Sequence, residues 1–437
     1  MFDPTSLLFG MDSFRVVSVI ALSGRADLRV VIETTGRDHG CPGCGVISSR
    51  VKERPTRQVR DLTASGQRVE LWWRARRLVC AETACRRSSF VERSDQIGLR
   101  SRLTGRFQDH LARSVAVSNR AVSEVGREHN VGWNTIHRAL VRAAERWLPT
   151  PAAVSVLGID ETRARSVRWV NADGVWKRSN PWLTSFVDVT PGVAGSLLGL
   201  TSGRSGACVK DWLQTQTVEF RNAITSVVID PSAPYASGIK AALPNAKIAV
   251  DHWHLVRLGN QLVTDVRQRV TRDLYGRRGL ASDRVWAHRQ MLLTAGERLS
   301  AGQLTRLDEV LDREDPTNEI GAAWAVKERL RMLLAERNPT QIQARLDRFF
   351  QDCADAQLPE ATRLARTIRT WWPHIRVFLE DGVTNARTEG FNRIIKQVKR
   401  VGCGFPNEAN YQRRILAHIA ITRTRPITPN PVRPAQR

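Results

Sequence analysis

The chain has 437 residues, and at roughly 150 residues per domain this length predicts two to four domains. Hydrophobic residues make up 42% of the sequence, which excludes a chain that is disordered throughout. Lys and Arg number 67 against 43 Asp and Glu, so the formal net charge is +24. A charge this positive predicts a polyanionic partner, most often nucleic acid. There is no apolar stretch of about 18 residues and no pattern typical of a secretory signal, so no membrane association is expected.

Arginine supplies 59 of the basic residues and lysine only 8. The planar guanidinium group pairs in two-pronged fashion with phosphate and with guanine, which suits a DNA-binding protein. A genome rich in Arg codons would explain the ratio equally well, but it would not explain the net charge. Seven cysteines, a small and odd number, favour a cytosolic protein with reduced thiols over a disulfide-bonded one.

The hydrophobic pattern divides the chain into consecutive blocks. Short β-like runs alternate with turns in the first hundred residues, at 14–21, 29–34 and 67–80. Residues 101–148 are predicted to be helical. Five β-like runs and one helix candidate follow, at 156–160, 167–171, 183–189, 226–230, 247–250 and, for the helix, 233–242. Long helical runs fill 256–379, a last helix is predicted at 384–400, and a proline-rich basic tail ends the chain.

Four of the seven cysteines form two close pairs, Cys41 with Cys44 and Cys80 with Cys85. In Cys41-Pro-Gly-Cys44-Gly the glycines let backbone amides turn toward the sulfur atoms. Four thiolates presented by two turns match the tetrahedral coordination that zinc prefers, so we predict one structural Zn2+. Inert cysteines or a redox pair are the alternative. Nearby arginines are predicted to lie on the surface of this module and to contact DNA phosphates: Arg74, Arg76, Arg77, Arg86 and Arg87.

Residues 118–140 contain two short helical patterns separated by a turn at His129–Gly132. This length and spacing are typical of a helix-turn-helix that binds DNA, although a helical hairpin within a core would give the same pattern. The second helix is predicted to present side chains of the types that contact base edges in a groove. These are Asn134, Thr135, His137 and Arg138.

Three acidic residues occupy positions suited to metal chemistry. Asp160 and Asp230 each end an apolar β-like run, and Glu389 lies early in the last helix. Two Mg2+ ions need oxygen ligands on rigid elements, and held roughly 4 Å apart they act on both the attacking and the leaving oxygen of a phosphodiester. A single aspartate at a strand end is commonly only a turn or a cap. Because Asp160 and Glu161 are adjacent on a strand, only one of them should face such a site.

Other polar residues lie near these acids in the sequence. Asn385, Asn392 and Lys396 share one helical face with Glu389, which suits a site beside phosphate. Asp251 and His254 follow the last β-like run, where they would either orient metal-bound water or DNA, or simply cap the next helix.

Taken together, these motifs resemble the zinc-finger-bearing insertion-sequence transposases of the ISL-three family. The resemblance covers residues 38–415 in family order. It rests on Cys-Pro-Gly-Cys-Gly with Cys80 and Cys85, Gly-Ile-Asp160-Glu, Val-Ile-Asp230-Pro-Ser-Ala-Pro-Tyr, Val-Asp251-His-Trp-His254-Leu-Val and Thr-Asn-Ala-Arg-Thr-Glu389-Gly-Phe-Asn-Arg-Ile-Ile-Lys. Pro231 departs from the family pattern, in which an apolar residue such as Met is expected, but the carboxylate before it remains.

The block pattern and the resemblance together imply a multidomain α+β protein. Its expected parts are a zinc-ribbon-like DNA-recognition module (1–100), a helix-turn-helix domain (101–150), an RNase H-like α/β core (151–255 and 380–420), a helical insertion (256–379) and a disordered basic tail (421–437). The resemblance implies that Asp160, Asp230 and Glu389 bind two Mg2+ or Mn2+ ions. It further implies a bacterial, cytoplasmic, nucleoid-associated enzyme that acts on double-stranded DNA as a homodimer or larger assembly.

The implied reaction is DNA transposition: binding of terminal inverted repeats, hydrolysis of a phosphodiester at the element end, and strand transfer by the freed 3′-OH. Two other functions remain open at the level of sequence. A sequence-specific regulator derived from such an enzyme would bind DNA without cutting it. A structure-selective nuclease would share the metal chemistry, but it would not need the zinc module and the helix-turn-helix.

Overall fold

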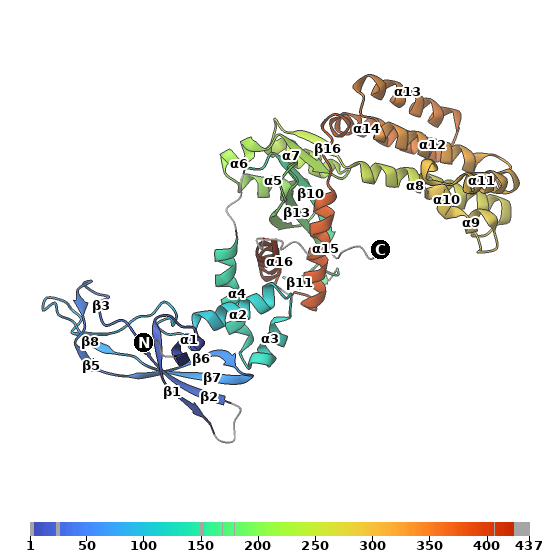
Figure 1. The fold of residues 1–437 in the computed structure, drawn as a ribbon. Helices are drawn as coiled ribbons and strands as arrows, with labels where there is room; N and C mark the ends of the chain where they lie inside the picture. The colour runs from blue at the N-terminus through green and yellow to red at the C-terminus, as the bar shows by residue number, and fades with distance from the viewer. Residues whose placement is uncertain are drawn as a thin grey trace, which may run out of the picture. The chain divides into compact units, whose positions relative to one another are not determined.

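The computed structural model describes residues 4–22, 27–148, 153–167, 169–178, 180–405 and 407–423, and the chain forms two compact units (Figure 1). The first unit comprises residues 1–149 and 398–437, and the second comprises 150–397. Residues 380–420 are predicted from the sequence to belong to the catalytic core. The structure instead divides this segment, and residues from 398 onward belong to the first unit.

The first unit combines two β-rich parts with a helical part. Its strands are β1 (Phe14–Ala21), β2 (Asp27–Thr34), β3 (His39–Gly40), β4 (Ile47–Ser48), β5 (Val51–Glu53), β6 (Thr56–Ala64), β7 (Gln67–Arg74), β8 (Arg77–Val79) and β9 (Ser89–Val91). Its helices are α1 (Pro4–Phe9), α2 (Gly105–Ala116), α3 (Val122–His129), α4 (Trp133–Trp147) and α16 (Glu408–Arg423).

A four-stranded sheet, in the order β1-β2-β7-β6, carries the first hydrophobic core. Phe14 and Trp73 meet there edge to face, with ring centroids 5.7 Å apart. The single run predicted at 67–80 is divided between β7 and β8. The division occurs at Arg76, whose backbone N–H donates to the buried carboxylate of Glu92 at 2.8 Å. The chain therefore leaves β7 and enters the small sheet β5-β8-β9.

Helices α2, α3, α4 and α16 share a second core. The Thr104 side chain caps α2, and Asn130, in the left-handed conformation, ends α3. Ala417 and Ile421 of α16 pack among the residues of α2 and α4. The sequence analysis began the disordered tail at residue 421, but the helix continues to Arg423 because its apolar side chains are buried here. The rest of that predicted tail lies outside the described residues.

The second unit contains a five-stranded sheet, a hairpin and a long helical segment. Its strands are β10 (Val156–Arg163), β11 (Trp169–Ala172), β12 (Val175–Arg178), β13 (Trp182–Asp188), β14 (Leu197–Ser202), β15 (Ser226–Ile229) and β16 (Lys247–Val250). Its helices are α5 (Gly206–Gln214), α6 (Val218–Ala223), α7 (Ala233–Ala242), α8 (His252–Tyr275), α9 (Arg284–Ala287), α10 (Arg289–Leu293), η1 (Gly296–Arg298), α11 (Ala301–Glu314), α12 (Glu319–Ala335), α13 (Pro339–Asp355), α14 (Pro359–Asp381) and α15 (Ala386–Val401).

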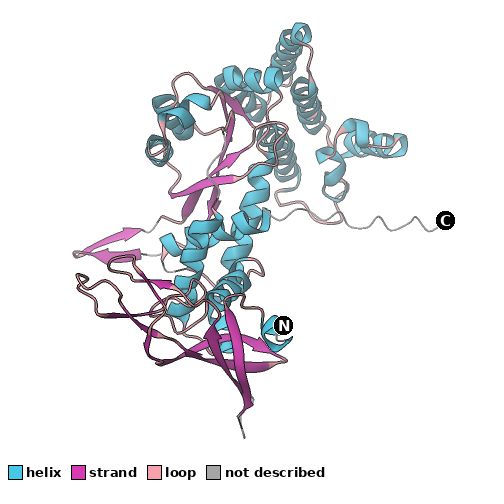
Figure 2. Ribbon diagram, turned by 60° about the vertical axis from the view of Figure 1, so that its left-hand side comes forward, coloured by secondary structure: helices cyan, strands magenta, loops and turns pink. Residues whose placement is uncertain are grey.

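The strand order of the main sheet is β14-β13-β10-β15-β16. β10 pairs antiparallel with β13 and parallel with β15, so it lies at the centre of a mixed sheet. One face of the sheet is buried with α5 and α7 in a core that includes Leu157 and Ile159 of β10. Figure 2 shows these strands in magenta among cyan helices. Residues 252–381, all of which the structure describes, contain only helices and turns, close to the predicted helical insertion.

The opposite face of β10 receives α15 at Gly158. A Cβ atom at this position would lie 2.5 Å from Thr388 Oγ1 and 2.6 Å from Asn385 Oδ1, both on or just before α15. Asn385 also donates from Nδ2 to the Ile159 carbonyl at 3.3 Å. The missing side chain therefore lets the last helix of this unit approach the strand that carries Asp160.

We expect Gly158→Ala to destabilise the protein by about 2 kcal/mol, because overpacking at a closed contact forces the neighbouring atoms apart. Chemical denaturation would measure the change. Gly302→Ala is a suitable control, since a Cβ atom there meets no heavy atom within 4 Å. Equal stability of the two variants would contradict this account of the packing.

Among the described residues, no helix is both long and apolar enough to cross a membrane.

Candidate functional site

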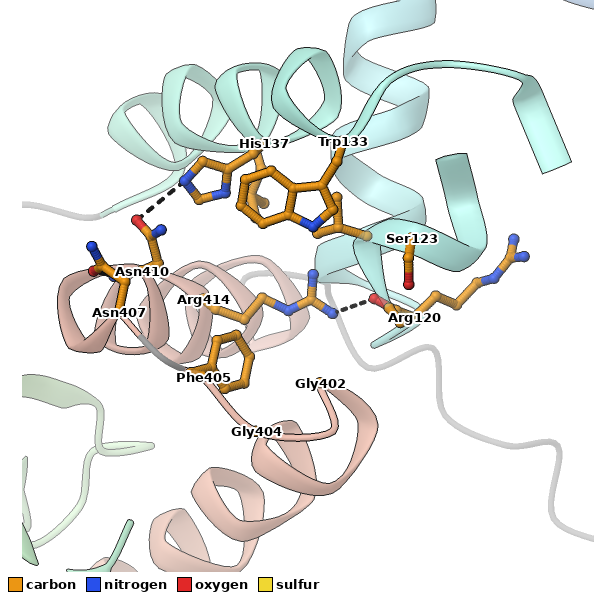
Figure 3. A pocket seen from close by; sticks show the side chains of 13 residues that line it. Arg120, Ser123, Trp133, His137, Gly402, Gly404, Phe405, Asn407, Asn410 and Arg414 are labelled. Atoms are coloured by element: carbon orange, nitrogen blue, oxygen red, sulfur yellow. Dashed lines mark hydrogen bonds between the residues drawn. The ribbon is translucent and has the colours of Figure 1, made fainter. Parts of the chain in front are cut away.

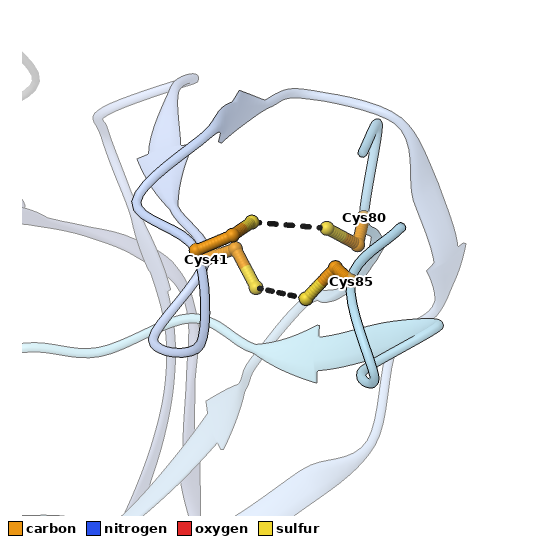
Figure 4. Close-up of side chains that lie close together, drawn as sticks. Cys41, Cys80 and Cys85 are labelled. Atoms are coloured by element: carbon orange, nitrogen blue, oxygen red, sulfur yellow. Dashed lines mark hydrogen bonds between the residues drawn. The ribbon is translucent and has the colours of Figure 1, made fainter. Parts of the chain in front are cut away.

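The four predicted zinc ligands lie together in the first unit (Figure 4). All four sulfur atoms are within 4.8 Å of one another. The Sγ atoms of Cys41 and Cys85 are 4.0 Å apart, and those of Cys44 and Cys80 are 3.5 Å apart. A tetrahedron with zinc–sulfur bonds of about 2.3 Å has sulfur atoms about 3.8 Å apart. The cluster therefore has the dimensions of a structural zinc site.

The turn that carries Cys41 also favours its thiolate form. Backbone N–H groups at Gly43 and Cys44 are directed at its sulfur atom and lower the pKa of Cys41 to about 7, although burial opposes the shift. Backbone N–H groups stabilise a negative sulfur atom in this way. The glycine-containing turn thus stabilises the thiolate, as the Cys-Pro-Gly-Cys-Gly pattern predicts.

The arginines around this cluster differ in their exposure and in whether they already form ion pairs. Arg86 and Arg87 are exposed. Arg74 and Arg77 are more than 40% exposed, and their partners are Glu33 and Glu53. Arg76 is different, because its guanidinium group is 11% exposed and bonds to Glu92, Thr34 and the Gly36 carbonyl. It cross-links the fold and is not available to DNA.

The side chains of α4 that were predicted to contact DNA also differ in exposure. Asn134, Thr135 and Arg138 of α4 are exposed, as expected of groove-contacting side chains. His137 instead points into the unit, where it stacks on Trp133 with ring centroids 4.7 Å apart. Its Nε2 atom lies 3.2 Å from Asn410 Oδ1 of α16. We therefore remove His137 from the expected DNA-contacting set.

A pocket of about 390 Å3 separates α3 and α4 from the segment around α16 (Figure 3). Trp133 and Phe405 contribute apolar surface to it. Arg414, 5% exposed, donates to the Arg120 carbonyl at 2.8 Å across one side. The pocket is thus enclosed by contacts that join α16 to the helix pair, which explains why residues near the C-terminus belong to the first unit.

In the second unit, Asp160 and Glu161 face opposite sides of β10, as strand alternation requires. Asp160 Oδ2 accepts a hydrogen bond of 2.6 Å from Asn392 Nδ2 on α15. Glu161 interacts with Tyr235 of α7 on the other side. Burial, followed by the negative charge of Asp230, raises the pKa of Asp160 to about 7. The same two causes raise the pKa of Glu161.

Asp230 directly follows β15, and Asp160 follows Ile159, which pairs in parallel with Ile229, so the two aspartates occupy neighbouring positions on adjacent strands. β10 continues to Arg163 in pairing with β13, so Asp160 does not end its strand as the run predicted at 156–160 implied. Asp230 Oδ2 lies 3.0 Å from His254 Nε2. This contact is the main cause that raises the pKa of His254. Asp251 caps α8 through the Trp253 backbone N–H, and its carboxylate lies within 4.8 Å of the ligand atoms of both Asp230 and His254.

Glu389 is placed differently from the two aspartates. Its side chain is 68% exposed and pairs with Arg393, one turn further along α15, at 3.1 Å. Asn385, just before this helix, and Asn392 on it are buried, each 4% exposed, whereas Lys396 is exposed. Among the described residues, the compact acid-and-histidine group is Asp230 with Asp251 and His254, and it includes neither Asp160 nor Glu389.

Two residues that support this region were not singled out from the sequence. Ser185 lies opposite Asp160 in the β10–β13 register, and its hydroxyl contacts both the Asp160 carbonyl and Asn392 Oδ1. Thr388 is fully buried against Gly158. The pairing of Ser185 depends on strand register, which the sequence does not reveal. The position of Thr388, three residues after Asn385, was a signal that could have been used.

Comparison with known proteins identifies the family once this geometry is established. A transposase family model of the ISL3 group matches residues 157–415, which is more than half of the chain. The chain belongs to the ISL3 transposase family. A second model, described as the zinc-finger of transposase IS204/IS1001/IS1096/IS1165, matches residues 37–85 of this transposase and so includes all four clustered cysteines.

A full-length relative gives the same result. The transposase for insertion sequence element IS1001 from Bordetella parapertussis is 24% identical over 398 residues, covering 89% of this chain and 91% of the relative. The family implies that this transposase binds DNA. The zinc-finger match and the cysteine geometry together support a structural Zn2+.

Proposed function

We propose that this chain cuts and joins DNA at the ends of its own mobile element, with Asp160, Asp230 and Glu389 as the metal-binding acids. The observation that carries the proposal is that Asp160 and Asp230 lie next to each other on adjacent strands, each directly after the residues through which β10 and β15 pair in parallel. Two carboxylates placed together in a half-buried site are unfavourable without a cation, as the raised pKa of Asp160 indicates.

The residues present fit a divalent metal ion. Asp230 Oδ1 is buried and has no hydrogen-bond partner, so one carboxylate oxygen is left for a cation. Mg2+ and Mn2+ prefer such oxygen ligands. Two ions bound there would activate the attacking water or 3′-OH and stabilise the charge that develops on the phosphodiester.

The neighbouring side chains orient the acids. Asn392 donates to Asp160 Oδ2, which directs the other oxygen of this carboxylate away from α15. His254 contacts Oδ2 of Asp230, and the charge of the aspartate favours the protonated imidazole. Asp230 keeps Oδ1 without a partner, and Asp160 Oδ1 accepts only the Glu161 backbone N–H, at 2.7 Å, which leaves it a further lone pair. The pair can therefore bind a metal without losing its anchors.

Glu389 is included because of its helix and not because of its present contacts. It lies between Asn385 and Asn392, which bind α15 to β10 beside Asp160. Its exposed ion pair with Arg393 is of a kind worth only about 0.5 kcal/mol, so metal binding would readily exchange it. We propose that Glu389 turns toward the aspartates when the metal ions and DNA bind.

The first unit is the proposed reading head for the element ends. We propose that α3 and α4 act as a helix-turn-helix, with Asn134, Thr135 and Arg138 of α4 in the major groove. Arg86 and Arg87, on the exposed edge of the zinc module, would contact phosphates, with Arg74 and Arg77 as weaker contributors because acids neutralise them. Joining two ends requires two copies of the site, so we propose a homodimer or larger assembly on DNA.

The fold of the second unit supports an RNase H-like interpretation. It has a mixed sheet with antiparallel strands on one side of β10 and parallel strands on the other, and helices on both faces. The helical segment from α8 to α14 lies between β16, the strand before Asp251, and α15, the helix that carries Glu389.

The test is an assay of cleavage and strand transfer with the full-length protein, Mg2+ and duplexes that end in the inverted repeats bracketing its gene. We expect Mg2+-dependent cutting at the repeat end and transfer of that end into a target duplex. Binding without cutting would overturn the proposal in favour of a regulator. Cutting that follows DNA shape and ignores the repeat sequence would overturn it in favour of a structure-selective nuclease.

The protonation of Asp160 predicts how metal binding depends on pH. Since the folded protein binds this proton more tightly than the unfolded chain does, the free energy of unfolding of the metal-free protein falls as pH rises from about 4 to about 7. Mg2+ must displace the same proton, so its affinity should fall about tenfold per pH unit below about 7. Titration calorimetry between pH 5.5 and 8.5 measures this, and equal affinity at pH 6 and 8 would contradict it.

A further inference from the structure

The helical segment of the second unit contains α8, α9 and α10 (Figure 1). Two adjoining hollows are lined by residues from the second half of α8 and from α9, α10 and the turns beside them. Their volumes are about 320 and 290 Å3. Arg267, Gln268 and Trp286 line both of them. Arg289 completes the first, and Arg272 and Arg278 complete the second. Four guanidinium groups thus surround one hollow region, and no acidic residue lines it.

Arg267 is the unusual member of this group. Arg267 is buried, with only 6% of the residue exposed. Among the described residues, its guanidinium group has no ion pair and no hydrogen bond. Burial, and then the positive charge of Arg289, lower the pKa of Arg267. A buried charge without a partner is costly, so a residue of this kind indicates an anion that completes the site.

The acids nearby are already engaged elsewhere. Glu360 and Glu319 pair with Arg269, the neighbour of Arg267 that faces the other way from α8. Asp283 pairs with Arg277 at 2.8 Å. Within the described part of the segment, no ion pair reaches Arg272, Arg278 or Arg289. The positive charge of the hollows is therefore not neutralised by the protein itself.

The remaining contacts hold these side chains in place and leave donors available. Arg289 stacks on the Trp286 ring at 3.7 Å and donates from Nη1 to the Trp286 carbonyl at 2.8 Å. Arg272 donates from Nε to the Gln268 carbonyl at 3.1 Å, so its two terminal nitrogens stay free. Guanidinium groups fixed in this way suit the tetrahedral oxygens of a phosphate group.

We propose that these hollows form a phosphate-binding site centred on Arg267, and that its ligand is a backbone phosphate of bound DNA. The choice of DNA as the source rests on the function proposed above, whereas the phosphate chemistry rests on the arginines alone. Free inorganic phosphate or a nucleotide would present the same group, and the experiment below separates these sources.

The position of Arg267 along α8 sets its distance from the proposed catalytic site. Arg267 follows His254, which contacts Asp230, by 13 residues of continuous helix. At about 1.5 Å per residue the two are about 20 Å apart. A DNA strand spaces its phosphates about 3.4 Å apart along the axis, so the captured phosphate would lie about six base pairs from the cleaved bond. The helix would then act as a ruler between the reacting phosphodiester and a second contact on the same duplex.

The test compares Arg267→Met with Arg306→Met in the full-length protein. Methionine keeps the buried stem and removes the charge, and Arg306 is an exposed arginine of α11 outside the hollows. In phosphate-free buffer we expect Arg267→Met to unfold at a higher temperature than the wild type. Inorganic phosphate should raise the melting temperature of the wild type and of Arg306→Met, but not that of Arg267→Met. An equal phosphate response in all three proteins overturns the site.

DNA binding at several salt concentrations identifies the source of the phosphate. If it is the duplex, Arg267→Met should lower the slope of log Kd against log salt by about one, and a methylphosphonate about six base pairs from the cleavage position should weaken binding to the wild type only. A phosphate response with no change in DNA binding overturns the DNA source and leaves a site for a free phosphate compound. The double variant Arg272→Met, Arg278→Met, both at exposed positions, repeats the test if Arg267→Met does not fold.

The outcome is separable from that of the proposed function. Asp160→Asn should retain the phosphate response and the salt slope while losing cleavage. If the wild type responds to phosphate but does not cleave DNA, only the transposase chemistry is rejected. Normal cleavage with no response would reject the phosphate site alone.

Discussion

Asp160→Asn and Asp230→Asn should each reduce Mg2+-dependent strand cleavage by at least about a thousandfold, because each removes a charged ligand from the proposed two-metal site. Glu389→Gln should have a comparable effect. Binding of end DNA should change little, since the proposed reading head lies in the first unit. Cleavage of a labelled repeat-end duplex and its binding by fluorescence anisotropy measure the two properties on the same preparations.

Asp211→Asn is the matched control, because Asp211 lies exposed on α5 and makes the same change of charge away from the site. It should cleave like the wild type. Cleavage above about one-tenth of the wild-type rate by Asp160→Asn or Asp230→Asn would reject the assignment of the aspartates. The same result for Glu389→Gln alone would reject only the third acid, and Asp251 would then be the next candidate.

A stability measurement distinguishes loss of chemistry from loss of fold. Asp160 holds its proton to about pH 7 because burial and Asp230 disfavour its charge. An amide removes that electrostatic cost, so metal-free Asp160→Asn should melt about 4 °C above the wild type at pH 8. Glu389 is exposed and carries no such cost, so Glu389→Gln should leave the melting temperature unchanged. A variant that is inactive yet more stable has lost a ligand and not its structure.

The sequence predicted the elements that carry the acids well, because their patterns are local. The strand at 247–250 and the helix at 233–242 were predicted to the residue, and alternation along β10 correctly separated Asp160 from Glu161. The hydrophobic period and strand geometry were sufficient for these conclusions. The family resemblance implied that Asp160 and Asp230 share metal ions, but the run predicted at 156–160 was too short, because β10 continues to Arg163.

The orientation of single side chains was harder to predict, because it depends on partners that are distant in sequence. Arg76 looked like a surface cation until Glu92, 16 residues away, was placed beside it. His137 looked like a groove-contacting residue, but Asn410, 273 residues later, contacts it. The chemistry expected from each residue type was right, but the exposure of both side chains was wrong. The residue type gives the chemistry of a side chain. Only the tertiary fold decides whether that side chain already has hydrogen-bond or ion-pair partners within the protein.

Removal of zinc from the cysteine cluster should weaken DNA binding by the first unit and leave Mg2+ binding by the second unit intact. Cys44→Ser should lower the zinc content from one ion per chain to none, because a serine hydroxyl is a poor zinc ligand. The small sheets β3-β4 and β5-β8-β9 have few buried apolar residues around Cys41, Leu78 and Phe90, so without the metal we expect them to unfold. Affinity for repeat-end DNA should then fall by about a hundredfold.

Cys403→Ser is the control that makes this result specific. Cys44 and Cys403 are both exposed, so neither substitution leaves a cavity in a core, and only Cys44 lies in the four-cysteine group. Zinc content by mass spectrometry, thermal unfolding and anisotropy with repeat-end DNA should be normal for Cys403→Ser. The five-stranded sheet of the second unit has a core of its own, so the proposed Mg2+ binding near Asp230 should survive in Cys44→Ser. Loss of both zinc and Mg2+ binding would mean that the cluster stabilises the whole chain, and that its part in DNA recognition is indirect.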